Sequence, residues 1–373
     1  MKLFIDFETR SACDLKACGA YKYAEDPTTD VLCLAVKMDD KAAELWVPDK
    51  FRHLAGDLPV INDWELAQLT KNAAELHAHN ANFERCLWRE VMYRRYGFPP
   101  IPLQAWRCTA AKAAAMNIPR HLDGACQTLG MPAKDKAGYR VMMRMCKPRR
   151  PRKAEREDNP DWETTLYWHE EPEDFQANAR YCLNDVEIEA ALDAALPDLT
   201  ETEQQLWELD QRINDRGVHV DLPSVEVILQ EVEAEKMRLV RELQALTHGQ
   251  VTEPSKIADL MTWLKTRNVD IPDVQVGTLK RWREYDMDES ARRAIDIRIA
   301  WSKATSCAKY DAMKRAACSD GRIRGMLLFY GAQATGRWSS RLVQLQNLAR
   351  GELKFPQVEQ YLWGVENMGV LNG

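Results

Sequence analysis

The first strand-like stretch of the chain, KLFIDFE at residues 2–8, carries carboxylates at two alternate positions, Asp6 and Glu8. Residues i and i+2 of a β-strand point to the same face of a sheet, so these two side chains are expected side by side. Like charges at that spacing repel each other unless a positive group lies between them, and a divalent cation is such a group. The stretch alone leaves open an exposed edge strand whose carboxylates face water.

Two later stretches add carboxylates to this pair. HAHNANFERCLW, at 77–88, places Glu84 near the start of a helix directly after a strand, and RYCLNDVEI, at 180–188, places Tyr181 and Asp185 on one helix face. Taken singly, these residues fit a first-turn helix acid, a core aromatic and a surface carboxylate. Together, four carboxylates can hold two divalent cations about 3.5–4 Å apart for phosphoryl hydrolysis, and oxygen ligands favour Mg²⁺ or Mn²⁺ over zinc. A tyrosine hydroxyl beside the cations can orient a water.

In order and spacing, the segments DFET, HNANFE and YCLND resemble the three motifs of the DEDDy 3′–5′ exonucleases, which form the proofreading domains of family A DNA polymerases. The resemblance implies a ribonuclease H-like fold. It also implies metal ligation by Asp6, Glu8, Glu84 and Asp185, a nucleophilic water held by Tyr181, and a primer terminus near Asn80 and Phe83. The second motif usually ends in aspartate, and a glutamate reaches about 1.5 Å farther.

A second resemblance lies near the end of the chain. GAQATGRWSSRLVQLQNL, at 331–348, is similar to the T-G-R-x-S-S…Q-N-L segment of family A DNA polymerases, where the thumb returns to the palm. The segments 212–226 and 252–260 also resemble parts of that thumb. Arginine pairs well with phosphates, and amides can hydrogen-bond groups in the minor groove. The expected nucleic-acid-binding residues here are Thr335, Gly336, Arg337, Arg341, Gln346 and Asn347, with Arg350 as a further phosphate partner.

The catalytic aspartates of family A polymerases belong to later motifs of the forms D-Y-S-x-I-E and H-D-E. Neither form occurs in the 373 residues. We therefore expect a family A DNA polymerase fragment of phage or prophage type, truncated before the polymerase motifs. Its expected activity is proofreading 3′–5′ exonuclease action during DNA replication, with no nucleotidyltransferase activity.

The elements that must position these residues follow an α/β pattern in the first half of the chain. Strand signals alternate with helical patterns, a loop is expected at about 132–173, and an amphipathic helix follows at 173–196. This order predicts a mixed sheet flanked by helices, and the second half reads as nearly all helical. The expected strands are 2–8, 31–38, 43–48 and 75–80. The expected domains are an exonuclease domain at 1–197, a thumb and start of palm at 198–350, and a truncated tail at 351–373.

Composition fits a globular protein, with 45% hydrophobic and 29% charged residues. No apolar run approaches the roughly 20 residues of a membrane span, so no membrane partner is expected. The ten cysteines contain no C-x-x-C pair, which favours reduced thiols and a cytoplasmic location in a bacterial or phage-infected cell. Net charge is -6, yet residues 280–350 hold fifteen basic against seven acidic residues. A second basic cluster, at 147–156, is expected to be a surface loop.

The expected partners are 3′ ends of single-stranded DNA and primer–template DNA, with replication proteins as unidentified further partners. The expected cofactors are two divalent cations, Mg²⁺ or Mn²⁺. Two alternatives remain at this point. One is a stand-alone DEDDy exonuclease acting on RNA, which the thumb-like half disfavours. The other is a catalytically dead DNA-binding remnant, favoured by Glu84 in place of aspartate and disfavoured by the retained carboxylates.

Overall fold

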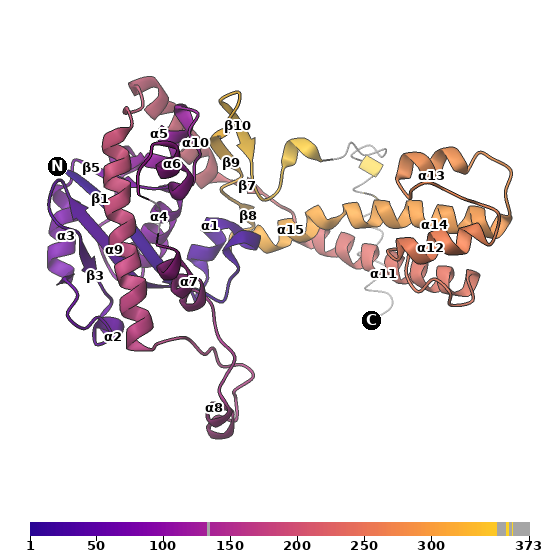
Figure 1. Ribbon diagram of the computed structural model, residues 1–373, viewed down its shortest axis with the longest axis horizontal. Coiled ribbons are helices and arrows are strands. Elements are labelled where there is room, and N and C mark those ends of the chain that lie inside the picture. The colour runs from indigo at the N-terminus through magenta and orange to yellow at the C-terminus, as the bar shows by residue number, and fades with distance from the viewer. Residues whose placement is uncertain (133–134, 349–355, 358–359, 361–373) are drawn as a thin grey trace. The chain divides into compact units, whose positions relative to one another are not determined.

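The computed structural model, shown in Figure 1, describes residues 1–132, 135–348, 356–357 and 360. The chain divides into two compact units. Among the described residues, the first unit consists of those in Met1–His219 and Ala316–Gln346, and the second consists of Val220–Arg315 with the few that follow from Asn347. The tail expected at 351–373 lies almost wholly outside the described residues.

A six-stranded sheet forms the centre of the first unit, in the order β4-β3-β2-β1-β5-β6. The β1–β2 and β2–β3 pairs are antiparallel, whereas the β1–β5, β5–β6 and β3–β4 pairs are parallel. The four expected strands are confirmed, and the sheet contains two further short strands, β4 and β6. The strands are β1 (Lys2–Arg10), β2 (Asp30–Met38), β3 (Glu44–Trp46), β4 (Val60–Ile61), β5 (Glu75–Ala78) and β6 (Trp106–Cys108).

One face of the sheet buries the odd-numbered residues of β1. Leu3, Ile5 and Phe7 belong to a hydrophobic cluster that also takes side chains from α1 (Leu15–Glu25) and α4 (Asn82–Leu87). The alternation follows from the two-residue period of a strand. Helix α1 was not expected from the sequence, because Gly19, with φ of 79°, interrupts its helical pattern.

The other face buries Phe4 of β1 under the long helix α9 (Pro172–Ala195), whose Phe175 and Cys182 belong to the same cluster. In Figure 1, α9 lies along this face beside β1. Pro172 occupies the first turn of α9, where its missing N–H costs no hydrogen bond. Since Asp6 and Glu8 are also even-numbered, the strand period directs them toward the α9 side of the sheet.

The loop expected at 132–173 is wrong, because two helices form there, α7 (Lys136–Met145) and α8 (Lys153–Asp158). Asp135 caps α7 by accepting hydrogen bonds from two backbone N–H groups of its first turn. Arg149 holds α8 through a double ion pair to Glu155. The remaining helices of this unit are α2 (Asp49–Arg52), α3 (Asp63–Asn72), α5 (Thr109–Ala115), α6 (Leu122–Thr128), α10 (Glu201–Arg216), η1 (Trp88–Tyr93) and η2 (Leu103–Ala105).

The segment 316–346 takes part in two small ladders, of which the first joins it to the preceding part of the unit and the second lies within the segment. β7 (Val218–His219) pairs with β8 (Arg322–Ile323), and β9 (Leu327–Ala332) pairs with β10 (Arg337–Ser340). Gly217 ends α10 and must be glycine, because its φ is 64° and a Cβ there would lie 2.5 Å from the carbonyl oxygen of Ile323.

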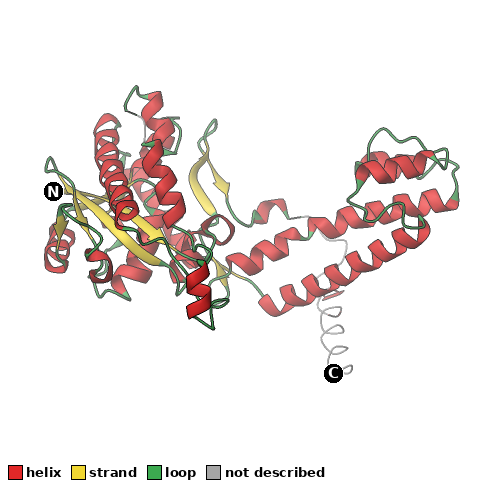
Figure 2. Cartoon of the chain, turned by 60° about the horizontal axis from the view of Figure 1, so that its bottom comes forward, coloured by secondary structure: helices red, strands yellow, loops and turns green. Residues whose placement is uncertain are grey.

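The second unit is helical, as expected. Its two long helices, α11 and α14, lie side by side in Figure 2 and enclose a core that includes Leu239, Leu243 and Ile295. None of the helices in the described residues has the length and apolar character that crossing a membrane requires. The elements are α11 (Leu222–Leu246), α12 (Ile257–Lys265), α13 (Val276–Trp282), α14 (Glu289–Ser306) and α15 (Ala308–Ala316). The short helix η3 (Leu345–Asn347) spans the boundary between the end of the first unit and the second.

Candidate functional site

A cavity of about 660 Å³ in the first unit brings the three acidic stretches of the sequence together. Such a volume lies within the range of sites that bind small molecules or single nucleotides. Its walls come from β1, α1, the β5–α4 turn, α4, α7, α9 and the segment after β10. The predicted residues that line it are Asp6, Glu8, Asn80, Phe83, Glu84, Tyr181, Asp185 and Arg341.

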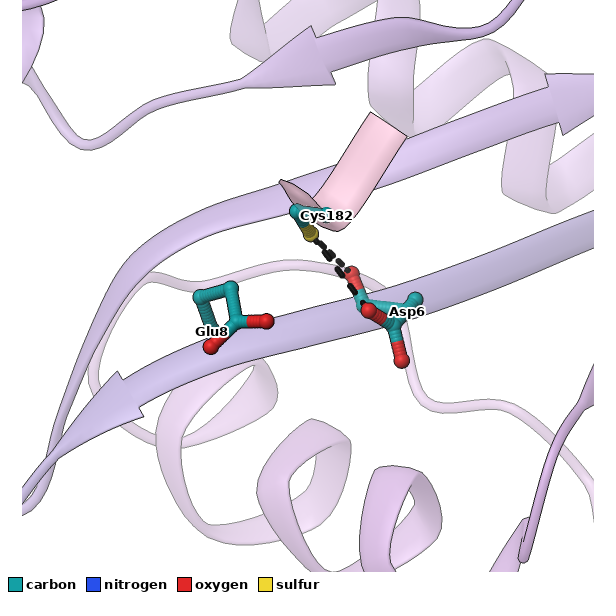
Figure 3. A group of neighbouring side chains, drawn as sticks. All are labelled: Asp6, Glu8 and Cys182. Carbon is teal, nitrogen blue, oxygen red and sulfur yellow. Dashed lines mark hydrogen bonds between the residues drawn. The ribbon is translucent and has the colours of Figure 1, made fainter. Parts of the chain in front are cut away.

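Asp6 and Glu8 lie close enough to share one cation. Figure 3 shows their carboxylates beside Cys182, and one ligand atom from each of the three lies within 4.8 Å of the others. The Cys182 thiol donates to the Asp6 backbone carbonyl at 3.3 Å and to its Oδ2 at 3.6 Å. The register of β1 against β2 shifts between Glu8 and Thr9, and bulges of this kind redirect side chains next to functional sites.

Glu84 is buried in the first turn of α4, with 4% of its surface exposed. The chain reaches this position through Asn80, whose φ of 71° turns it sharply from β5 into the helix. Within the described residues, Glu84 Oε2 accepts no hydrogen bond. Burial, and then the negative charge of Asp6, raise the pKa of Glu84 well above its usual range. A bound cation would compensate such a carboxylate.

Tyr181 and Asp185 lie one turn apart on α9 and are 3% and 4% exposed. Helix α7 approaches Tyr181 closely at Gly138, where a Cβ would come within 2.7 Å of the tyrosine ring. The ring is therefore fixed between two helices, and its position on the cavity wall follows from this packing.

The polar face of α9 continues beyond the predicted pair to Glu189 and Asp193, which the sequence reasoning missed. Thr109 donates to Glu189 at 2.7 Å, and Lys112 donates to Asp193 at 2.6 Å. Burial opposes ionisation of Asp193, but hydrogen bonds and charges from His77 and Lys112 lower its pKa overall. These carboxyl groups are satisfied by protein partners, and neither lines the cavity. The four-residue spacing from Tyr181 to Asp193 was visible in the sequence.

A second group with metal-like spacing lies at His169, Glu171 and Asp174, all partly exposed. Its carboxylates already have cationic partners. Arg152 forms an ion pair with Glu171, and Arg144 forms one with Asp174. The charge of this group is therefore balanced by the protein itself.

Three basic residues, Lys16, Lys147 and Arg341, also line the acidic cavity. Lys16 and Lys147 were not predicted as site residues, because nothing local in the sequence links them to the acidic motifs. Arg341 was predicted to bind nucleic acid, and the structure places it at this cavity.

The other residues predicted from the second resemblance lie elsewhere. Thr335, Gly336 and Arg337 form the turn from β9 into the exposed start of β10, where the Gly336 N–H bonds the Ala332 carbonyl. Gln346 accepts a hydrogen bond from Ser340 at 2.8 Å and lines a separate, smaller cavity. Asn347 belongs to the second unit, and Arg350 lies outside the described residues.

Comparison with known proteins points to polymerases. No protein-family model matches the chain. The chain is 36% identical over 356 residues to a DNA polymerase of Bacillus phage SP02, and the alignment covers 94% of this chain and 52% of the relative. The chain thus spans about half the length of this curated relative.

A solved structure shares the fold. The POL domain of Pol1 from M. smegmatis, in complex with DNA primer-template and dNTP, matches with a TM-score of 0.51 and 16% sequence identity. The match covers 93% of this chain and 53% of the solved chain. A mixed sheet flanked by helices, as found here, is thus similar to part of a DNA polymerase domain.

Proposed function

We propose that the chain is a fragment of a family A DNA polymerase of phage type, and that its first unit is a metal-dependent 3′–5′ exonuclease of the DEDDy type. One observation carries this proposal: Asp6, Glu8, Glu84 and Asp185, with Tyr181, come from three separate stretches and line a single cavity. Two others support it. The sheet joins an antiparallel β3-β2-β1 meander to parallel β5 and β6, a mixed sheet flanked by helices of the kind that the exonuclease resemblance implies. The similarity to a phage DNA polymerase favours DNA over RNA as substrate.

The residues present fit a pair of divalent cations. The oxygens of Asp6 and Glu8 lie within reach of one ion, and the buried Glu84 Oε2, which accepts no hydrogen bond from the described residues, is a suitable ligand. Asp185 faces the same cavity. Ligands that are all oxygen favour Mg²⁺ or Mn²⁺. When bound, such ions lower the pKa of a water and stabilise charge on the departing 3′ oxygen.

The remaining residues of the cavity would bind and orient the strand end. Phe83 packs against Tyr23 at 5.9 Å between ring centroids, and this aromatic wall offers a surface on which a base can stack without sequence choice. The Asn80 side chain offers an amide for hydrogen bonding. The Tyr181 hydroxyl would orient the attacking water, a role for which its fixed ring is suited.

Digestion of 5′-labelled single-stranded DNA tests the proposal, with Mg²⁺, with Mn²⁺ and with EDTA. We expect a ladder that shortens from the 3′ end and requires metal. Asp6→Ala should reduce the rate by at least about 1,000-fold, and Tyr181→Phe by about 10- to 100-fold. Asp57→Ala, at an exposed position outside the cavity, is the matched control and should cleave as the wild type does.

Two outcomes would favour the alternatives. Faster degradation of a 5′-labelled RNA of the same sequence would point to an RNA exonuclease. Intact binding of primer–template DNA, with no cleavage by the wild type under either metal, would point to a DNA-binding remnant without catalysis.

A further inference from the structure

Arg341 lines the acidic cavity, although it lies far along the sequence from the carboxylates of that cavity. It follows β10, in the segment that resembles the polymerase thumb-to-palm connection, yet it lines the same cavity as Asp6, Glu84 and Asp185. The nearby Arg337 does not line this cavity. The two arginines of the TGRWSSR stretch therefore face different surroundings.

The backbone around Arg341 is held in an uncommon conformation. Leu342 has φ of 55°, in the left-handed region that bulky residues rarely adopt. Its side chain fills the space above Gly19 of α1, where a Cβ would lie 2.7 Å from the leucine Cδ1. The Arg341 N–H also bonds the Met326 carbonyl at 2.8 Å. Since strained conformations persist where surrounding contacts impose them, this packing fixes the point from which Arg341 enters the cavity.

The Arg341 side chain has unused hydrogen-bonding capacity. Its Nε is buried and donates no hydrogen bond to any described residue. A second arginine, Arg120, lies near enough for its pKa to be affected by the Arg341 charge, although burial is the larger cause of the lowering. Arg120 itself donates to the Phe329 carbonyl at 2.8 Å. Arg341 thus brings a positive charge to the cavity wall beside a second cation, and this charge favours an anionic ligand in the cavity.

We propose that Arg341 binds a backbone phosphate of the DNA strand whose 3′ end occupies the cavity. The polymerase-like segment would thus supply a substrate-binding residue to the exonuclease site. This inference rests on the proposed function. A guanidinium matches the geometry of a phosphate with two parallel hydrogen bonds, so arginine is better suited here than the exposed Lys16 and Lys147, which line the same cavity.

Binding and cleavage measured side by side test the inference. Binding is followed by fluorescence anisotropy of a short labelled oligothymidylate in EDTA, over a series of salt concentrations. Arg341→Gln should weaken binding by about 10- to 100-fold. It should also reduce the slope of log affinity against log salt by about 0.7, the share of one phosphate contact on single-stranded DNA. In Mg²⁺, KM should rise while kcat changes little.

Two further variants separate the phosphate contact from a general effect. Arg341→Lys keeps the charge and loses the planar fork, so it should restore the salt slope but only part of the affinity. Arg52→Gln, which removes an exposed charge outside the cavity, should stay within about twofold of the wild type in binding and cleavage. An Arg341 with a purely structural role would lower thermal stability and leave the salt slope unchanged, and that result would overturn the inference.

Failure of the inference and failure of the proposed function give different results. If the wild type cleaves DNA and Arg341→Gln matches it in affinity, salt slope and KM, the proposed phosphate contact is wrong and the proposed exonuclease function is supported. If the wild type does not cleave DNA, yet Arg341→Gln lowers the affinity for DNA and the salt slope, the proposed exonuclease function is wrong and the proposed phosphate contact is supported.

Discussion

Two acidic groups in the first unit offer oxygen ligands at metal-like spacing, and they differ in their surroundings. Asp6 and Glu8 share a cavity with two more carboxylates, and the Asp6 hydrogen bonds drawn in Figure 3 come from a neutral thiol, Cys182. Glu171 and Asp174 are partly exposed and form ion pairs with arginines. Spacing alone would rank the two groups equally.

One carboxyl group of each set has a shifted pKa, and the two shifts have opposite directions. Burial, with the charge of Asp6, raises the pKa of Glu84. A hydrogen bond from its own backbone N–H, with a further contribution from Arg152, lowers the pKa of Glu171. Burial disfavours the charged form of Glu84, whereas a backbone N–H and an arginine favour the charged form of Glu171. The difference indicates that a carboxyl group whose charge is disfavoured by burial, rather than ligand spacing, marks the cation site.

The largest expected effect separates the two groups directly. Glu84→Gln should reduce exonuclease activity by roughly 100-fold or more, because a metal ligand loses its charge. The same change should stabilise the metal-free protein by about 1 kcal/mol, because it removes a buried charge. The rate is measured on labelled DNA in Mg²⁺, and stability by urea unfolding in EDTA.

Glu171→Gln is the matched control and should behave in the opposite way. Its activity should stay within about twofold of the wild type, and its stability should fall by less than about 1 kcal/mol, since a partly exposed ion pair is lost. The proposed difference between the two groups is contradicted if Glu84→Gln keeps full exonuclease activity, or if both variants lose activity equally.

An intermediate effect is expected at Asp210 of α10, a carboxylate outside both groups that is 1% exposed. Burial raises its pKa to about 6, although Arg341 and Arg120 lie near enough to lower it. Since the folded carboxyl keeps its proton up to a higher pH than the unfolded one, the free energy of unfolding should fall as pH rises from about 4 to 6. The loss should be at most about 3 kcal/mol.

Asp210→Asn should flatten this pH dependence, measured by urea unfolding at pH values on either side of the window. The variant should be more stable than the wild type above pH 6 and nearly equal to it at pH 4. If the stability of the variant depends on pH as strongly as that of the wild type, burial of the Asp210 carboxylate does not destabilise the protein. It would weaken the argument that uncompensated burial marks a site.

The smallest effect is expected where the second group meets solvent. Arg144→Gln breaks the ion pair to Asp174, in which the side chains are 47% and 22% exposed. Such pairs contribute about 0–1 kcal/mol, and salt screens them. Thermal unfolding at low and high salt should therefore show a slight destabilisation that disappears at high salt. A loss of several kcal/mol would indicate that this group organises the fold.

The sequence was most informative where its signal was local. The alternation in β1 predicted both the strand and the shared direction of Asp6 and Glu8, and the four-residue spacing in α9 predicted one face for Tyr181 and Asp185. The prediction of a loop at 132–173 was wrong. Helix α8 is held by an ion pair that the local sequence pattern does not show, whereas α7 has an apolar face, with Val141 and Met145 on the core, that the prediction overlooked.

Long-range contacts account for what the sequence did not reveal. Lys16, Lys147 and Arg341 meet the acidic residues at one cavity only after the chain has folded back on itself. Strand and helix periods describe neighbours within an element and carry no information on such convergence. The motif resemblance named the carboxylates, but it did not place Arg341 beside them.

The pairing of β7 with β8 has a consequence for biosynthesis. The chain leaves the first unit after His219 and rejoins it at Ala316, so the whole segment Val220–Arg315 is translated between the two parts of that unit. A ribosome-bound chain therefore contains every carboxylate of the cavity well before Arg341 is made. Until translation passes the inserted unit, the nascent protein would carry the carboxylates of the site with Lys16 and Lys147 but without Arg341.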